Sequence, residues 1–153
     1  MKIVLCSDNH SDLDVVKKIA MINNDADYYW HLGDSESLDA INELKPFVGV
    51  RGNNDCDLNL PKIKIVSIDN LHFLLVHGHE QIRGNYMGLY NLAIEKNCNV
   101  VLYGHTHLFD DFEYNGIRFI NPGSCLYNRN GEGPTYALIN TDGKSLEIIK
   151  KHI

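Results

Sequence analysis

The chain has 153 residues, 44% of them hydrophobic, which is enough for one substantial core and predicts a single domain over residues 1–153. Its formal net charge of −6 disfavours nonspecific binding to nucleic acid or to an anionic membrane. No run approaches the roughly 20 consecutive apolar residues that span a bilayer, and the N-terminus turns polar too early for a signal peptide, so we expect a cytoplasmic protein.

Cysteine and histidine are the informative minor residue types. Cys6, Cys56, Cys98 and Cys125 lie far apart without a CxxC pair, which favours reduced thiols over a disulfide framework or a zinc ribbon. Eight histidines are unusual for this length. Four of them stand next to the ends of predicted strands.

Apolar runs and amphipathic stretches alternate along the first fifty residues. The runs predict buried strands, and the amphipathic stretches predict helices that begin at serine N-caps. Strands are expected at 2–7, 28–32 and 47–50, and helices from Ser11 to Asn23 and from Ser35 to about Leu44. Each of these strands ends beside polar residues.

The rest of the chain is predicted to form mostly hairpins, because turn pairs such as Asn115-Gly116 separate apolar runs. We expect hairpins of 63–68 with 71–76, 109–114 with 117–120, and 136–140 with 145–149, a helix at about 86–96 and a strand at 100–103. A βαβαβ half followed by hairpins predicts an α/β fold, in which two mixed sheets pack face to face with helices outside.

The stretch Gly104-His105-Thr106-His107 follows the strand at 100–103. Side chains two positions apart in an extended segment point the same way, so both histidines can face one cavity, and Gly104 permits a turn or a close approach of the backbone. Taken alone, the stretch fits two exposed loop histidines better than a metal site. Other strand ends, however, carry similar residues.

Potential metal ligands collect at the ends of five predicted strands. They are Asp8, His10, Asp34, Asn53, His77, His105 and His107. Taken singly, each has an ordinary explanation such as a helix cap, a turn or a buried histidine. The carboxyl ends of parallel strands share one edge, however, so we expect the seven side chains to converge. Imidazoles with carboxylates suit Mn, Fe, Co, Ni or Zn, and seven donors fit two ions with Asp34 shared between them.

Two divalent ions at this edge favour phosphate-ester hydrolysis. Their charge exceeds that of Asp8, Asp34 and a bridging hydroxide, which leaves about one positive charge for an anionic substrate. Two ions roughly 3.5–4 Å apart hold the hydroxide in line with phosphorus and stabilise the charge on the phosphoryl oxygens. No side-chain nucleophile is then required.

The chain resembles the calcineurin-like metallophosphoesterases, and in particular their small single-domain phosphodiesterases. The matching blocks are Asp8-Asn9-His10, Gly33-Asp34, Gly52-Asn53-Asn54-Asp55, His77-Gly78-His79 and Gly104-His105-Thr106-His107. The resemblance implies a four-layer αββα sandwich and a small phosphodiester or other phosphate ester as substrate. It implies one metal on Asp8, His10 and His107, a second on Asn53, His77 and His105, and Asp34 as the bridge. We expect manganese first, with Ni, Fe, Co or Zn as alternatives.

One position departs from the family pattern. Many members have a histidine directly after the metal-binding asparagine, assigned to leaving-group protonation and phosphate binding, whereas this chain has Asn54. Asparagine releases no proton at neutral pH, but the small phosphodiesterases commonly lack this histidine as well. His79 either donates the proton instead or has a supporting or surface role, and Asn121 and Ser124 are interpreted as structural first. The candidate catalytic residues are Asp34, Asn53, Asn54 and His79.

Two other functions remain open from the sequence. A scaffold subunit of the retromer complex has this fold but is essentially non-catalytic, and a storage metal protein has a closed coordination shell. All seven ligand positions hold competent donors, and seven residues leave room for water at two metals, so we expect an enzyme. The hairpin edge near 114–120 is a candidate for forming a homo-oligomer.

Overall fold

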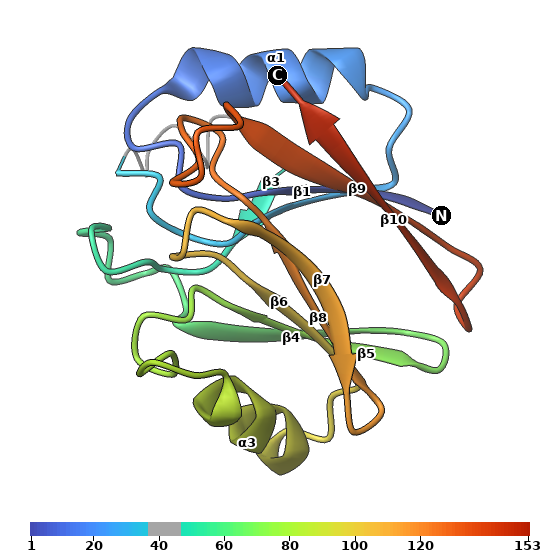
Figure 1. Ribbon diagram of the computed structural model, residues 1–153. Helices are drawn as coiled ribbons and strands as arrows, with labels where there is room; N and C mark the ends of the chain where they lie inside the picture. Colours follow the sequence, from blue (N-terminus) through green and yellow to red (C-terminus); the bar gives the residue numbers. More distant parts are fainter. Residues whose placement is uncertain (37–46) are drawn as a thin grey trace.

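Two five-stranded mixed sheets pack face to face in the computed structural model, which describes residues 1–36 and 47–153 (Figure 1). The first sheet has the order β10-β9-β1-β2-β3, with β1 at Lys2–Cys6, β2 at Tyr28–His31, β3 at Phe47–Gly49, β9 at Thr135–Thr141 and β10 at Leu146–His152. The second has the order β4-β5-β6-β8-β7, with β4 at Ile63–Ile68, β5 at Leu71–Val76, β6 at Val100–Tyr103, β7 at Phe109–Tyr114 and β8 at Ile117–Pro122.

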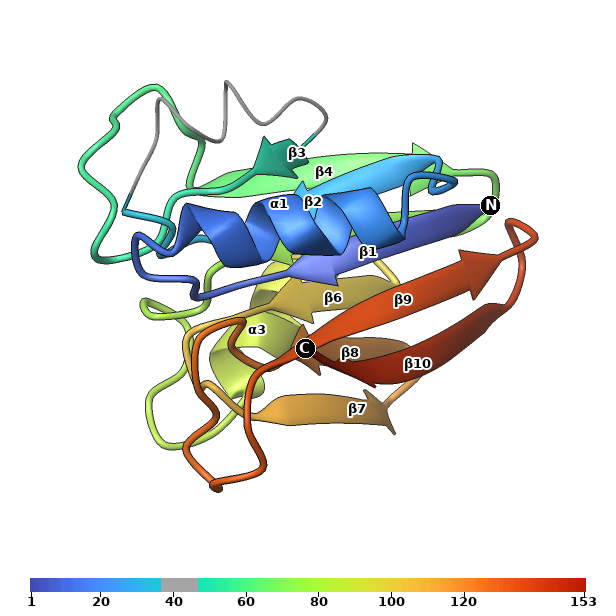
Figure 2. The same ribbon diagram turned by 90° about the horizontal axis from the view of Figure 1, so that it is seen from above.

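Within the described residues, one helix covers the outer face of each sheet (Figures 1 and 2). Helix α1, Leu13–Ile22, packs Val16 and Ile19 on the first sheet, and α3, Met87–Glu95, packs Leu89 on the second. The predicted αββα layering is therefore confirmed. The helix predicted from Ser35 to Leu44 falls, after its first two residues, outside the described part of the chain.

The beginning of α1 differs from the prediction. Asp12, not Ser11, is the N-cap, and its Oδ1 accepts the backbone N–H of Val15 at 3.1 Å. Ser11 has a φ of +69° and donates its backbone N–H to the carbonyl of Ser35 at 2.9 Å. It therefore belongs to a turn that joins the ends of β1 and β2, and the helix begins after that turn.

Alternation along β1 divides its side chains between two cores. Ile3 and Leu5 face the second sheet, whereas Val4 faces α1. Between the sheets, Trp30 of β2 meets Phe73 of β5 edge-on, with 5.2 Å between ring centroids. The loops after β1, β2, β3, β5 and β6 emerge on the same side of the molecule, at the left of Figure 1.

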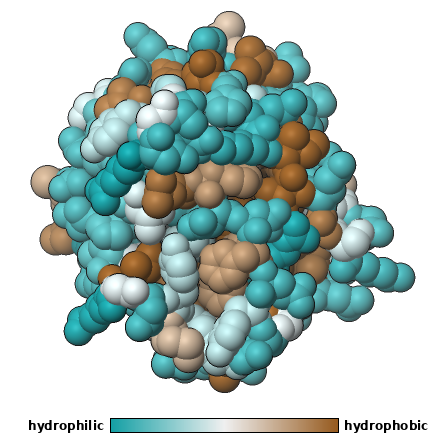
Figure 3. Space-filling view, in the orientation of Figure 1, coloured by the Kyte–Doolittle hydropathy of each residue, from teal (hydrophilic) through white to brown (hydrophobic). Residues whose placement is uncertain are grey.

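The visible surface is mostly polar (Figure 3), and the cysteines are unpaired. Most of the face in Figure 3 is hydrophilic, with apolar side chains in separate patches. Within the described residues, no helix is long and apolar enough to cross a membrane. All four cysteines are free thiols, as predicted.

Candidate functional site

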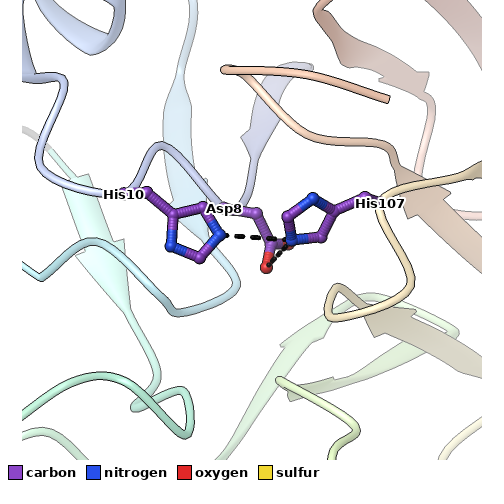
Figure 4. Close-up of side chains that lie close together, drawn as sticks. All are labelled: Asp8, His10 and His107. Carbon is purple, nitrogen blue, oxygen red and sulfur yellow. Dashed lines mark hydrogen bonds and ion pairs between the residues drawn. The ribbon is translucent and has the colours of Figure 1, made fainter. Parts of the chain in front are cut away.

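The loops after β1 and β6 bring together Asp8, His10 and His107 (Figure 4). One potential ligand atom from each lies within 4.8 Å of the others. Oδ1 of Asp8 is 3.2 Å from Nε2 of His107, and the Nε2 atoms of His10 and His107 are also 3.2 Å apart. These three residues form what we call the first group.

A second group adjoins the first and shares Asp8 with it. Its members are Asp8, Asp34 and His77, and the Nε2 atom of His77 lies 3.4 Å from Oδ2 of Asp34 and 3.9 Å from Oδ1 of Asp8. Asn53 extends this group, because its Oδ1 is 3.2 Å from the same Nε2. The strand ends of both sheets thus meet in one cluster, with Asp8 at its centre.

The hydrogen bonds around two histidines show what the cluster can bind. Nδ1 of His77 donates to the carbonyl of Leu32 at 2.7 Å, and Nδ1 of His10 lies 2.6 Å from Oε1 of Glu36. Both rings therefore direct the lone pair of Nε2 into the cluster. Among the residues that the structure describes, none gives a hydrogen bond to Oδ1 of Asp8, which is buried there. Lone pairs and carboxylate oxygens that face one another repel, so the residues fit divalent cations.

The pKa values in the cluster also indicate a site that favours cations. Burial alone raises the pKa of Asp34, but His77 and the hydrogen bonds from Asn54 outweigh it and hold the pKa well below its usual range. Burial also opposes ionisation of Asp8, whose pKa is nevertheless lowered by His107 and His77. Burial lowers the pKa of His77, but the two carboxylates raise it above its ordinary value. The space between these groups therefore stabilises positive charge.

The remaining predicted site residues lie around this cluster. His105 packs beside His77, with 5.3 Å between ring centroids, but is a member of neither group, and its backbone N–H donates to Oδ2 of Asp8 at 3.1 Å. His79 is partly exposed, and its ring centroid is 5.5 Å from that of His77. Asn54 binds both oxygens of Asp34, through its backbone N–H at 2.8 Å and through Nδ2 at 2.7 Å.

Asn121 and Ser124 hold two loops of the cluster in place through hydrogen bonds to the backbone. Nδ2 of Asn121 donates to the carbonyl of Gly104 at 2.8 Å, and Oγ of Ser124 donates to the backbone carbonyl of Asp8 at 2.8 Å. The interpretation of both as structural residues agrees with these contacts. Asn121 and Pro122 extend the strand predicted at 117–120, since they are the last residues of β8 and pair with β7.

Most candidate ligands occupy a strained backbone conformation. Those with positive φ are Asp8 (56°), His10 (42°), Asp34 (52°), His105 (66°) and His107 (57°). This left-handed region costs a residue with a side chain roughly 1–2 kcal/mol, and it concentrates at functional sites because surrounding contacts must hold it. The apolar pattern of the strands does not predict these positive φ values.

Two glycines allow the loops to approach one another. A Cβ atom on Gly33 would lie 2.6 Å from the backbone nitrogen of Gly52, and one on Gly104 would overlap Oγ of Ser7 and approach the carboxylate of Asp8. The close backbone approach predicted at Gly104 is therefore present. Larger residues at these two positions would separate the strand ends that carry the ligands.

Two acidic residues of the site had no role assigned from the sequence. Asp55 is buried and accepts four backbone N–H groups, from Gly52, Asp34, Ser35 and Glu36. It therefore fastens the loop after β2 to the loop after β3. Glu36 orients His10 from 26 positions away, and its only signal in the sequence is that it closely follows Asp34.

Comparisons with known proteins agree with this geometry. The model of the calcineurin-like phosphoesterase superfamily domain matches residues 1–144. A phosphodiesterase of Methanocaldococcus jannaschii is 33% identical over an alignment of 170 residues, which covers 97% of this chain and 98% of that protein. The structure of a conserved protein of Streptococcus pneumoniae, a predicted phosphoesterase, is similar with a TM-score of 0.88 and 25% identity, over 99% of this chain and 88% of that one.

A likeness to Vps29 concerns the fold alone. The structure of Entamoeba histolytica Vps29 complexed with Zn²⁺ has a TM-score of 0.79 and 21% identity, over 99% of this chain and 98% of that chain. Similarity at this level of identity shows a shared arrangement of strands and helices but not a shared chemistry of the site.

The contact between Glu36 and His10 gives a test of the first group. Glu36→Gln removes the negative charge that faces Nδ1 of His10 and nearly keeps the volume, so we expect metal affinity to fall about 10-fold to 100-fold. Calorimetric titration of chelator-treated protein with Mn²⁺ measures it. Glu95→Gln, at an exposed carboxylate of α3, is the matched control and should bind like the wild type. Equal affinities in all three proteins would contradict the orienting role.

Proposed function

The chain belongs to the calcineurin-like phosphoesterase superfamily, and we propose that it acts as a metal-dependent phosphodiesterase, with residues 1–153 as one domain. The observation that carries the proposal is the cluster at the strand ends, where the buried side chains of Asp8, Asp34 and His77 converge and where, within the described residues, no lysine or arginine pairs with either carboxylate. Its donor types suit first-row divalent ions, manganese first and Ni, Fe, Co or Zn as alternatives.

Each side of the cluster holds one metal in this proposal. Asp8, His10 and His107 would hold the first ion, Asn53, His77 and His105 would hold the second, and Asp34 would serve both. When bound, the two ions would activate water as the nucleophile and supply positive charge for the phosphoryl oxygens. The chain's own contribution is orientation. Leu32 and Glu36 fix the rings of His77 and His10, and Asp55 fixes the loop that carries Asp34.

The surroundings of Asn54 favour a diester as the substrate. Its Nδ2 donates to Oδ2 of Asp34, and an amide releases no proton at neutral pH, so Asn54 supplies no acid to a leaving group. His79 is an imidazole beside the second group that the proposal does not use as a metal ligand, and burial beside His77 lowers its pKa, which favours the neutral ring. A site without a strong acid favours good leaving groups, and a singly charged diester matches its residual charge of about one.

A non-catalytic scaffold that resembles the retromer subunit is the alternative. The likeness of the fold to Vps29 supports it at the level of architecture. The complete set of donors favours the enzyme, because a scaffold needs no buried carboxylate with an unpartnered oxygen such as Oδ1 of Asp8. The two functions differ in turnover, which the first experiment below measures.

Metal dependence is the direct test of the proposed function. Chelator-treated protein should lose all hydrolysis of bis(4-nitrophenyl) phosphate, and Mn²⁺ or Ni²⁺ should restore it better than Ca²⁺, which prefers oxygen ligands. Phosphomonoesters and cyclic nucleotides assayed beside the diester define the substrate class. Full activity in metal-free protein would refute the metal mechanism, and absence of turnover with every metal and ester would favour the scaffold.

The bridge is tested by comparing two carboxylates. Asp34→Asn should weaken both ions together, because a bridging ligand serves each of them, and metal content and turnover should fall in parallel. Asp8→Asn provides the comparison, since Asp8 is the residue that belongs to both groups. If Asp34→Asn still binds two ions and turns over normally while Asp8→Asn loses both, the bridging role belongs to Asp8.

Asn54 is tested by restoring the missing acid. Asn54→His should raise alkyl monoester hydrolysis more than aryl diester hydrolysis, since general-acid help is worth about 100-fold to 10,000-fold where a proton is needed. Asn54→Ala is the control, because it also breaks the bond to Asp34 but supplies no acid. A monoester-to-diester ratio that is the same in both variants, with metals bound, would show that position 54 is not where the acid acts.

A further inference from the structure

Tyr127 stands at the rim of the metal cluster with a half-exposed side chain. Its relative exposure is 50%, and its ring meets the ring of His107 edge-to-face, with 4.8 Å between centroids and 63° between planes. His107 directs Nε2 toward Asp8 and His10. The free part of the tyrosine ring therefore borders the space in which an ester bound at the first group would extend.

The turn that carries Tyr127 is fastened to the loops of the cluster. Oγ of Ser124 accepts the backbone N–H of Tyr127 at 3.1 Å and donates to the carbonyl of Asp8 at 2.8 Å. Two residues beyond Tyr127, the backbone N–H of Arg129 donates to the carbonyl of His107 at 3.1 Å. Both ends of the turn thus bond to backbone atoms of candidate ligands.

A buried asparagine makes the same turn rigid. Oδ1 of Asn128 accepts the backbone N–H of Ser124 at 2.8 Å, and its Nδ2 donates to the carbonyl of Gly133 at 2.7 Å and to Oγ1 of Thr135 at 2.9 Å. An exposed aromatic ring on a fixed backbone loses little conformational entropy when a ligand covers it. The ring of Tyr127 is therefore preorganised for binding, because hydrogen bonds fix the backbone that carries it.

We infer that Tyr127 forms one wall of a subsite for a planar aromatic ester group, such as a nucleobase or an aryl ring. The inference rests on the proposed function, because the metals would hold the phosphate. The cluster itself offers charge and coordination, which recognise phosphate but not the group esterified to it. Stacking on an aromatic side chain recognises a flat π-system and tolerates different bases. Tyr127 would thus select among phosphate esters without touching the reacting atoms.

The test compares two ligands that carry the same kind of phosphate group. Adenosine 5′-monophosphate has an aromatic base, and ribose 5-phosphate lacks it. In calorimetric titrations of Mn²⁺-loaded protein, we expect the nucleotide to bind about 5-fold or more tightly, the low end of what stacking contributes. The ratio should fall to about one in Tyr127→Ala and persist in Tyr127→Phe. Tyr114→Ala, at a similarly exposed tyrosine of β7, should leave it unchanged.

The outcomes separate the subsite from the proposed function. Equal affinities for the two ligands in the wild type, or an unchanged ratio in Tyr127→Ala, overturn the subsite and leave the metal chemistry untouched. The wild-type ratio tests the inference even if Tyr127→Ala fails to fold. If metal-loaded protein binds no ribose 5-phosphate while nucleotide binding still depends on Tyr127, the subsite stands and phosphate recognition by the metals fails.

Discussion

The contact between the inner faces of the two sheets determines where every candidate ligand lies. Asp8, Asp34 and Asn53 follow strands of the first sheet, whereas the histidines of the second group and of the Gly-His-Thr-His loop follow β5 and β6 of the second. Neither sheet alone holds all members of either group. The apolar packing of Trp30 on Phe73 and of their neighbours therefore sets how closely the candidate ligands approach one another, as well as the stability of the fold.

The loops that carry the candidate ligands hold those side chains close together at the cost of backbone strain. Five of the seven candidate ligands lie in left-handed backbone conformations, and the second group brings two carboxylates close together. Both features destabilise the folded chain. Asp55 and Ser124 offset part of this cost through hydrogen bonds that also fix the loops. A metal that binds the folded state adds further stability by mass action. With a metal bound, the site would be held by the scaffold and by the ion together.

The sequence predicts the architecture well, because apolar periodicity and turn pairs mark each described strand to within three residues. It also predicts that polar residues at strand ends gather on one edge. It does not predict that Asp8 is shared by both groups. Nor does it predict the hydrogen bonds from Asn54 to Asp34 or the contact by which Glu36 orients His10. These features depend on positive φ values and on side-chain contacts between loops, which leave no periodic pattern in the chain. The N-cap at Asp12 was missed for the same reason.

The pairing of His10 with His107 joins positions 97 residues apart. An ion held by both would act as a reversible cross-link that closes a loop of almost a hundred residues, and in the chain-entropy model a permanent link of that length is worth about 4–5 kcal/mol. The first group is complete only after the second sheet has formed, because its last ligand follows β6. Ion capture would therefore be a late event of folding, and metal supply would govern how long the folded chain resists proteolysis.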